Sequence, residues 1–73
     1  MDDKRPIDVL DAAKGKRVVI KLKDGHEVSG ILQALDMHLN MWLDNAEVKE
    51  SEKTKKTGKV LVRGDSIVWA SPE

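Results

Sequence analysis

The fold is decided by residues 17–35, which read RVVIKLKDGHEVSGILQAL. In the first part of this stretch, apolar and polar side chains alternate and β-branched residues dominate. This pattern is typical of a half-buried β-strand, whose buried face would consist of Val18, Ile20 and Leu22. The strand leads into Asp24-Gly25, a dipeptide that favours a two-residue β-hairpin turn.

After this turn, a second strand is expected from His26 to Leu35, with Val28, Gly30 and Leu32 on one face. A glycine inside a strand often marks a bulge or a sharp bend. Gly30 therefore predicts that the sheet curls strongly, as a closing sheet requires.

The residues before this hairpin predict a short helix from Pro6 to Lys14. Proline suits a first helical position, Asp8 favours the positive N-terminal end, and Gly15 follows the last turn. The apolar side of this helix would consist of Ile7, Leu10 and Ala13. A helix this short is unstable alone, so we expect that side to pack on the sheet.

Residues 41–48 form the expected third strand, with Met41 and Leu43 on one side and Trp42 on the other. A second tryptophan, Trp69, lies near the C-terminus. Large aromatic side chains in strands most often fill a core or an interface between subunits. We expect one of these two places for both tryptophans.

The charged tract from Lys49 to Lys56 is interpreted as a solvated hairpin tip, because charges of both signs alternate within it. Val60 and Val62 begin a fourth strand. A fifth strand comprises residues 67–69 and ends at Ser71-Pro72.

Together these elements predict a mostly β protein, with a short N-terminal helix followed by a strongly bent, five-stranded antiparallel barrel. In an up-and-down arrangement, the second and fourth strand connections lie at the same end. The second connection is Asp36-Met37-His38-Leu39-Asn40, and the fourth is Arg63-Gly64-Asp65. We expect these two polar segments to be neighbours in space.

The two polar segments contain side chains that can bind a nucleic-acid base. Asn40 offers an amide donor and acceptor to a base edge, while His38 and Arg63 offer flat groups that stack on an unstacked base. Asp65 is better suited to orienting a neighbouring side chain than to contacting an anionic ligand. The alternative is that these residues are present only because tight turns favour Asp, Asn and Gly.

Other chemistries have weaker support. His38 beside Asp36 or Asp65 could act as a general base, but the chain has no cysteine and its serines lack a nucleophile signature. Arg63-Gly64-Asp65 also spells an adhesion tripeptide, a short match with a high chance rate. His26 and His38 should lie at opposite ends of the second strand, which disfavours a shared metal site. We expect no enzyme activity, no cofactor and no metal.

Length and composition limit the remaining possibilities. A chain of 73 residues without cysteine has a small core and no disulfide, so we expect it to oligomerise. Thirteen basic and thirteen acidic residues cancel, which argues against coating nucleic acid through bulk charge. The N-terminal residues 1–5 lead into a mixed polar segment without the apolar run of a signal peptide or membrane span, so we expect a cytoplasmic protein.

These features resemble the Sm and Sm-like family. Arg17 to Val48 is similar to the first Sm motif, and Lys59 to Ala70 is similar to the second. A variable charged loop, residues 49–58, separates the motifs, and a single Sm-like domain would span residues 1–73. The residues that carry the first motif are Gly30, Leu32, Asp36, Asn40, Leu43 and Ala46. The short length and the Val-Arg-Gly-Asp core of the second motif are most similar to the archaeal branch.

The resemblance implies the Sm fold, an SH3-like barrel that assembles into a ring, usually a heptamer in archaea. Strand four of one subunit would pair with strand five of the next. The two polar segments would line a central pore and bind short uridine-rich single-stranded RNA, one nucleotide per subunit. Such a ring would act in RNA processing or as an RNA chaperone, with other RNA-processing proteins as further partners.

The resemblance assigns the RNA-binding site to Asp36, His38, Asn40, Arg63, Gly64 and Asp65. His38 and Arg63 would stack on the base, and Asn40 would hydrogen-bond its edge. Asp65 would orient Asn40, and Gly64 would permit close approach of the backbone. Repetition of Arg63 around one pore would concentrate positive charge that the neutral total hides. Two alternatives stay open: a structural or protein-interaction ring without base-specific binding, and a preference for single-stranded DNA.

Overall fold

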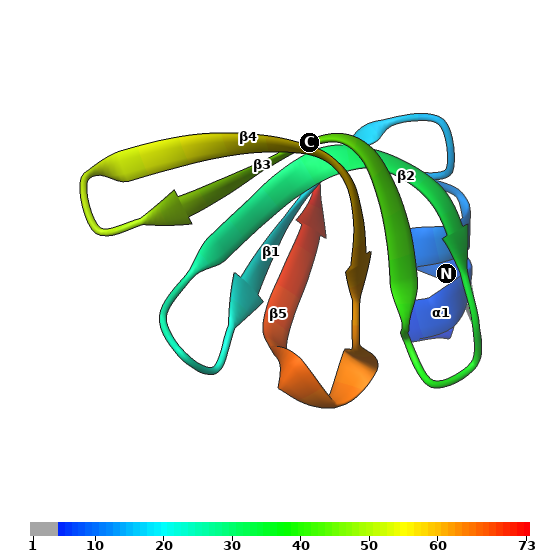
Figure 1. Cartoon of the computed structure of the whole chain (residues 1–73). Helices are drawn as coiled ribbons and strands as arrows, with labels where there is room; N and C mark the ends of the chain where they lie inside the picture. Colours follow the sequence, from blue (N-terminus) through cyan, green and yellow to red (C-terminus); the bar gives the residue numbers. More distant parts are fainter. Residues whose placement is uncertain (1–4) are drawn as a thin grey trace.

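The computed structural model describes residues 5–73. The expectation that no signal peptide is present rests partly on residues 1–4, which lie outside the described residues. Within the described chain, one α-helix precedes five strands (Figure 1). The elements are α1 (Pro6–Asp11), β1 (Arg17–Leu22), β2 (Glu27–Leu35), β3 (Met41–Glu50), β4 (Lys53–Val62), a short 3₁₀ turn η1 (Gly64–Ser66) and β5 (Ile67–Pro72).

The five strands form one antiparallel sheet in the order β4-β3-β2-β1-β5. The sheet is strongly bent, and β2, β3 and β4 curve across β1 and β5 (Figure 1). β4 and β5 are the two edges, and in the described chain they do not pair with each other. The prediction of a short helix followed by a bent, five-stranded antiparallel barrel is confirmed, with the barrel open between β4 and β5.

The core lies on the inner face of the bent sheet. The alternation predicted for β1 and β2 is confirmed, because Val18, Ile20, Val28 and Leu32 are at most 2% exposed. The remaining buried apolar residues are Leu10, Ala13, Met41, Leu43, Ala46 and Val62. Full burial of one such aliphatic side chain stabilises the fold by roughly 1.5–3 kcal/mol. Leu10 and Ala13 bring α1 and the turn after it onto this core, as the apolar side of the helix predicted.

A bulge in β3 lies opposite Gly30 and bends the sheet at the place that Gly30 predicts. The register between β2 and β3 shifts at this position, and Asn45 on β3 takes a φ of 48°. A Cβ on Gly30 would lie 3.0 Å from the Asp44 carbonyl oxygen and 3.1 Å from the Cα of Ala46. Any larger residue would therefore push β3 away and weaken the bend.

The predicted end of the helix is wrong by three residues. α1 ends at Asp11 rather than Lys14. The Lys14 amide donates to the Asp11 carbonyl, three residues back, at 3.2 Å. Bonds of this kind tighten the end of a helix into 3₁₀ geometry, which ends the α-helix early. Within residues 5–73, no helix is both long and apolar enough to span a membrane.

The turn after β1 contains three residues rather than the predicted two. The Leu22 amide donates to the His26 carbonyl at 2.9 Å, and residues 23–25 lie inside this closing bond. Gly25, the third of them, has a φ of 96°, the left-handed conformation that such three-residue loops require.

The charged tract, residues 49–56, is the exposed end of the β3–β4 hairpin, as its composition predicts, but most of it is strand rather than turn. β3 and β4 both continue into it, so only residues 51–52 form the turn. Opposite charges face each other across the two strands, with Glu47 opposite Lys56 and Glu50 opposite Lys53. Such pairs favour strand pairing where no apolar core is available. The fourth strand therefore begins earlier than predicted, and the hairpin projects from the barrel (Figure 1).

Neither tryptophan lies in the core. Trp42 is 41% exposed on the outer face of β3, and Trp69 is 46% exposed on β5. The strand that carries Trp69 is an edge strand and extends to Pro72 rather than ending before it. The prediction of a core position is wrong for both residues, and a position at a subunit interface stays a prediction.

Candidate nucleic-acid interface

The loop between β2 and β3, residues 36–40, is held by one carboxylate. Asp36 Oδ1 accepts hydrogen bonds from the backbone amides of His38 at 2.9 Å and Asn40 at 3.1 Å. The chain reverses at Leu39, whose φ is 63° and whose amide donates to the Asp36 carbonyl at 3.0 Å. An aspartate at the start of a turn favours this local bonding, which fixes the backbone positions of His38 and Asn40.

Asp36 also orients the side chain of Asn40. Asn40 Nδ2 donates to Asp36 Oδ2 at 3.0 Å. This bond, helped by the backbone amides of Asn40 and His38, lowers the pKa of Asp36 below its ordinary value. The carboxylate is therefore charged at neutral pH. Because the Asn40 nitrogen faces Asp36, its Oδ1 faces the second polar segment.

Gly64 joins the second polar segment to the first. Its amide donates to Asn40 Oδ1 at 2.8 Å, across 24 positions of sequence. Gly64 begins η1, which the Ser66 amide closes onto the Arg63 carbonyl at 3.0 Å. A Cβ on Gly64 would collide with the backbone carbonyl of His38. Glycine is therefore needed here so that the two loops can touch, and the predicted adjacency of the two polar segments is confirmed.

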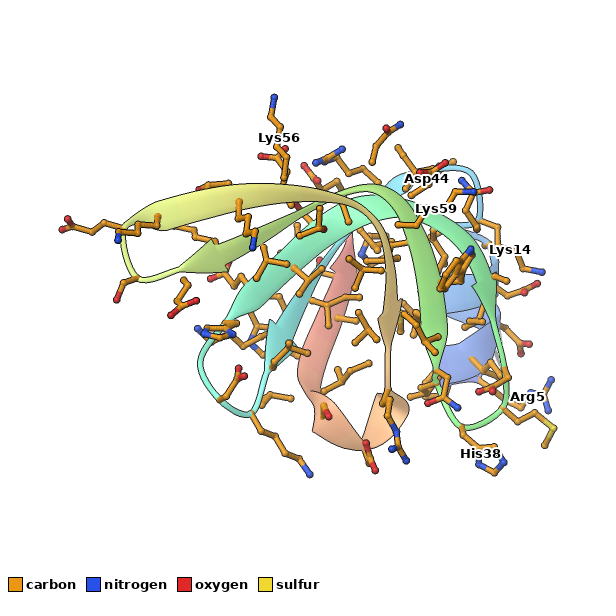
Figure 2. All side chains as sticks on the ribbon, viewed as in Figure 1. Arg5, Lys14, His38, Asp44, Lys56 and Lys59 are labelled. Carbon is orange, nitrogen blue, oxygen red and sulfur yellow. The ribbon has the colours of Figure 1, made fainter. Side chains whose placement is uncertain are left out.

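The two loops together line one open pocket, formed by His38, Asn40, Arg63, Gly64 and Asp65. Five of the six residues predicted for the site are thus brought together. The sixth, Asp36, does not line this pocket and contacts Asn40 instead. Figure 2 shows the His38 ring at the end of its loop, pointing away from the barrel.

Arg63 and Asp65 are the most freely exposed charges of the pocket. Their side chains are 75% and 71% exposed, and Arg63 Nη2 lies 3.5 Å from Asp65 Oδ2. An ion pair this exposed contributes little and leaves the guanidinium free to turn toward a ligand. The family resemblance gives Asp65 the role of orienting Asn40. In the described residues Asp36 does so, while Asp65 lies near Arg63 and accepts from the Ser66 hydroxyl at 3.4 Å.

The pocket can bind a flat, uncharged ring beside a phosphate. The Asn40 amide uses one N–H on Asp36 and one lone pair on Gly64, so one donor and one acceptor stay available for a base edge. The Arg63 guanidinium can stack on such a ring or pair with a phosphate, and the exposed His38 ring supplies a second flat surface. Single-stranded nucleic acid offers this combination of base edge, base face and phosphate.

Sequence reasoning missed the contact between Asp36 and Asn40. The signal was present in the spacing of Asp36 and Asn40 around a turn, because an aspartate there reaches the amides that follow it. Within residues 5–73, no group of three or more His, Cys, Asp or Glu side chains is arranged to hold a metal ion.

Comparison with known proteins places the chain in a family. The family model described as the LSM domain matches residues 8–72. The Sm-like protein of Methanococcoides burtonii is 44% identical over 69 residues, which are 93% of this chain and 96% of that protein. The SmAP1 heptamer of P. aerophilum has a TM-score of 0.91 and 35% identity, and covers 99% of this chain and 97% of its own.

A further solved structure is the Sm protein of Pyrococcus abyssii in complex with a uridine heptamer. Its TM-score is 0.90 and its identity 38%, and the match covers 96% of this chain and all of that one. The family model spans most of the described residues, including both loops of the pocket. The chain therefore belongs to the LSM family.

Proposed function

We propose that this chain, as a single domain, assembles into a ring of seven copies and binds uridine-rich single-stranded RNA at the central pore. The observation that carries the proposal is the 2.8 Å hydrogen bond from Gly64 to Asn40, because it makes one pocket from two distant segments. Two solved relatives support it. The P. aerophilum protein is a heptamer, and the P. abyssii protein is in complex with a uridine heptamer.

The pocket geometry supports a base-binding role for each residue. Asn40 pairs with the edge of the base through the donor and acceptor that its own contacts leave available. His38 and Arg63 stack on the two faces of the base. Asp36 holds Asn40 in place, Gly64 lets the loops meet, and Asp65 lies beside Arg63 at the edge of the pocket. The role is binding of RNA without catalysis, in the cytoplasm, with RNA-processing proteins as partners.

The open edges of the sheet support the ring. β4 and β5 are both edge strands, and each carries exposed apolar side chains: Leu61 at 58%, Val68 at 60% and Trp69 at 46%. Unpaired strand edges bearing apolar side chains favour pairing with another chain. Pairing of β4 with β5 of the next copy repeats the same contact around an axis, and such a head-to-tail interface closes into a ring.

A ring also reconciles RNA binding with the zero net charge of the chain. Each copy places one Arg63 at the pocket, with the side chain 75% exposed. Repetition around a single pore gathers these cations within a short distance, and focused positive charge attracts the phosphates of a single strand. The total of thirteen basic and thirteen acidic residues does not report this local field.

The experiment that tests the proposal combines native mass spectrometry with base competition. The intact chain should give a heptamer, and a uridine heptamer should add one strand per ring. Unlabelled uridine, adenine and cytosine oligomers should then displace a labelled uridine oligomer unequally, with uridine the strongest. A ring that binds all three equally or not at all would instead be a structural or protein-interaction scaffold. Parallel competition by deoxyuridine oligomers measures the preference for RNA over DNA.

A further inference from the structure

The hairpin formed by β3 and β4 carries a concentration of positive charge that the candidate pocket does not use. Residues 49–59, here called the basic arm, contain five lysines and two glutamates, a net charge of +3. Because the whole chain is neutral, the remaining residues carry −3. The five lysines are Lys49, Lys53, Lys55, Lys56 and Lys59.

Within residues 5–73 the lysine side chains of the basic arm form no close ion pair, although Lys53 and Lys56 lie opposite glutamates across the two strands. All five side chains are exposed, and none of these side chains takes part in a hydrogen bond or ion pair within residues 5–73. The Glu47 carboxylate pairs instead with Arg17, at 3.1 Å, and the Glu50 carboxylate lies 3.5 Å from the His26 ring. The ammonium groups are therefore accessible to a ligand. Figure 2 shows Lys56 extending away from the ribbon.

The basic arm stays accessible in the proposed ring. β4 has ten residues, whereas β5 has six, so pairing with β5 of the next copy cannot cover all of β4. The apolar side chains that favour this pairing lie at the other end of β4, at Leu61, and on β5. The first half of β4, with Lys53, Lys55 and Lys56, therefore lies outside the interface.

We propose that the basic arm binds the phosphodiester backbone of single-stranded RNA that extends beyond the uridines in the pocket. This inference rests on the proposed function, since it concerns the same RNA. The cations occupy both faces of the hairpin: Lys53 and Lys55 follow one face, and Lys56 and Lys49 follow the other. Lysine binds phosphate as a flexible point charge, which suits a mobile single strand.

The chemistry of the basic arm favours a phosphate backbone over other acidic partners. It contains no aromatic side chain on which a base could stack and no exposed apolar anchor of the kind that holds a protein partner. Binding should therefore be independent of sequence and strongly dependent on salt. The pocket selects the base, and the basic arm adds affinity for longer strands.

Two RNAs and matched variants test this inference. One RNA is the uridine heptamer, and the other is the same heptamer with an unstructured tail of about 16 nucleotides, the upper site size of single-strand-binding folds. The test variant combines Lys53→Gln, Lys55→Gln and Lys56→Gln. The control combines Lys14→Gln, Lys16→Gln and Lys23→Gln, and a triple arginine variant keeps the charge of the basic arm.

The unmodified chain should bind the tailed RNA more tightly than the heptamer. The glutamine variant should lose this gain, about tenfold or more, and its slope of log affinity against log salt should fall by about 2, since each single-strand phosphate contributes about 0.7. Binding of the heptamer should not change. The arginine variant and the control should keep the gain.

Several results would overturn the inference. The first is that the unmodified chain binds the tailed RNA no more tightly than the heptamer. The second is that the glutamine variant keeps the added affinity for the tailed RNA, and the third is that the control variant loses it equally. Polyglutamate and polyuridylate are also compared as competitors of the tailed RNA. If polyglutamate displaces the tail at the same charge concentration as polyuridylate does, the basic arm binds acidic proteins instead. Failure of the proposed function is distinguishable, because it appears as loss of uridine preference in the heptamer alone.

Discussion

The Gly64 amide donates to Asn40 Oδ1 at 2.8 Å, and this one bond connects loops that lie 24 positions apart. The bond is short because the backbone of Gly64 sits directly on the His38 carbonyl, where a Cβ does not fit. Asp36 fixes the other end of the same amide at 3.0 Å. Asn40 is therefore both a member of the pocket and the side chain that holds the pocket together.

Removal of the Asn40 amide should weaken RNA binding and the connection between the loops. In Asn40→Ala, the Gly64 amide and Asp36 lose their shared partner, and loss of the part-buried bond to Gly64 costs about 1 kcal/mol of stability. We expect affinity for a uridine heptamer to fall at least about tenfold, while the core keeps its fold. Fluorescence anisotropy at fixed salt measures the affinity. Gln33→Ala, which removes an exposed amide from β2, is the matched control and should bind normally.

Arg63 should contribute to binding without contributing to stability. Its side chain is 75% exposed, and its one ion pair within residues 5–73 is with Asp65, at 3.5 Å, so Arg63→Ala should change the free energy of unfolding by less than about 0.5 kcal/mol. Loss of stacking should cost about 1–3 kcal/mol of binding. Arg63→Lys separates charge from stacking, because it should keep the salt dependence and lose most of the affinity. Unchanged affinity in both Asn40→Ala and Arg63→Ala would disprove the assignment of the site.

The sequence predicted those parts of the fold in which side-chain pattern and backbone requirement agree. Alternation placed Val18, Ile20 and Val28 in the core, and Gly30 located the bulge. Counting connections then placed the two polar segments at one end, and the bond between them confirms it. These features depend on the periodicity of apolar side chains and on the positions of glycine, and both can be read from a single sequence.

The features that could not be predicted depend on how the strand backbones pair, or on which of two similar side chains makes a given contact. The exposure of residues 49–56 was predicted, but the continuation of the ladder between β3 and β4 through them was not; opposite charges face each other there. Two carboxylates, Asp36 and Asp65, flank the site, and the structure shows that Asp36 is the one that reaches Asn40. A sequence gives the residue types at a site, whereas the choice between two aspartates depends on distances of about an ångström.

The lowered pKa of Asp36 predicts a response to acid. Because the folded-state pKa lies below its ordinary value of 3.8, the charged carboxylate stabilises the folded loop above that pH. This contribution is lost as the pH falls through the lower, folded-state pKa. Carboxyl NMR titration should give Asp36 a midpoint below 3.8. In Asn40→Ala the midpoint should rise, because the side-chain bond from Asn40 is the largest cause of the shift. A midpoint unaffected by Asn40→Ala would contradict the role given to this bond.

Assembly should depend on the exposed apolar residues of the sheet edges. Leu61 is 58% exposed on β4, so Leu61→Glu should leave the fold of one chain intact. In the proposed ring the same change buries an unpaired charge against β5 of the next copy, which costs several kcal/mol per interface. Native mass spectrometry should therefore show monomers in place of rings, with an unchanged circular dichroism spectrum. Met37→Glu is the matched control, because Met37 is 86% exposed in the loop between β2 and β3 and belongs to neither edge strand. If the Leu61→Glu variant forms rings as stable as those of the unmodified chain, β4 is not part of the interface. If the Met37→Glu variant loses its rings, the interface is formed by the pocket loops instead.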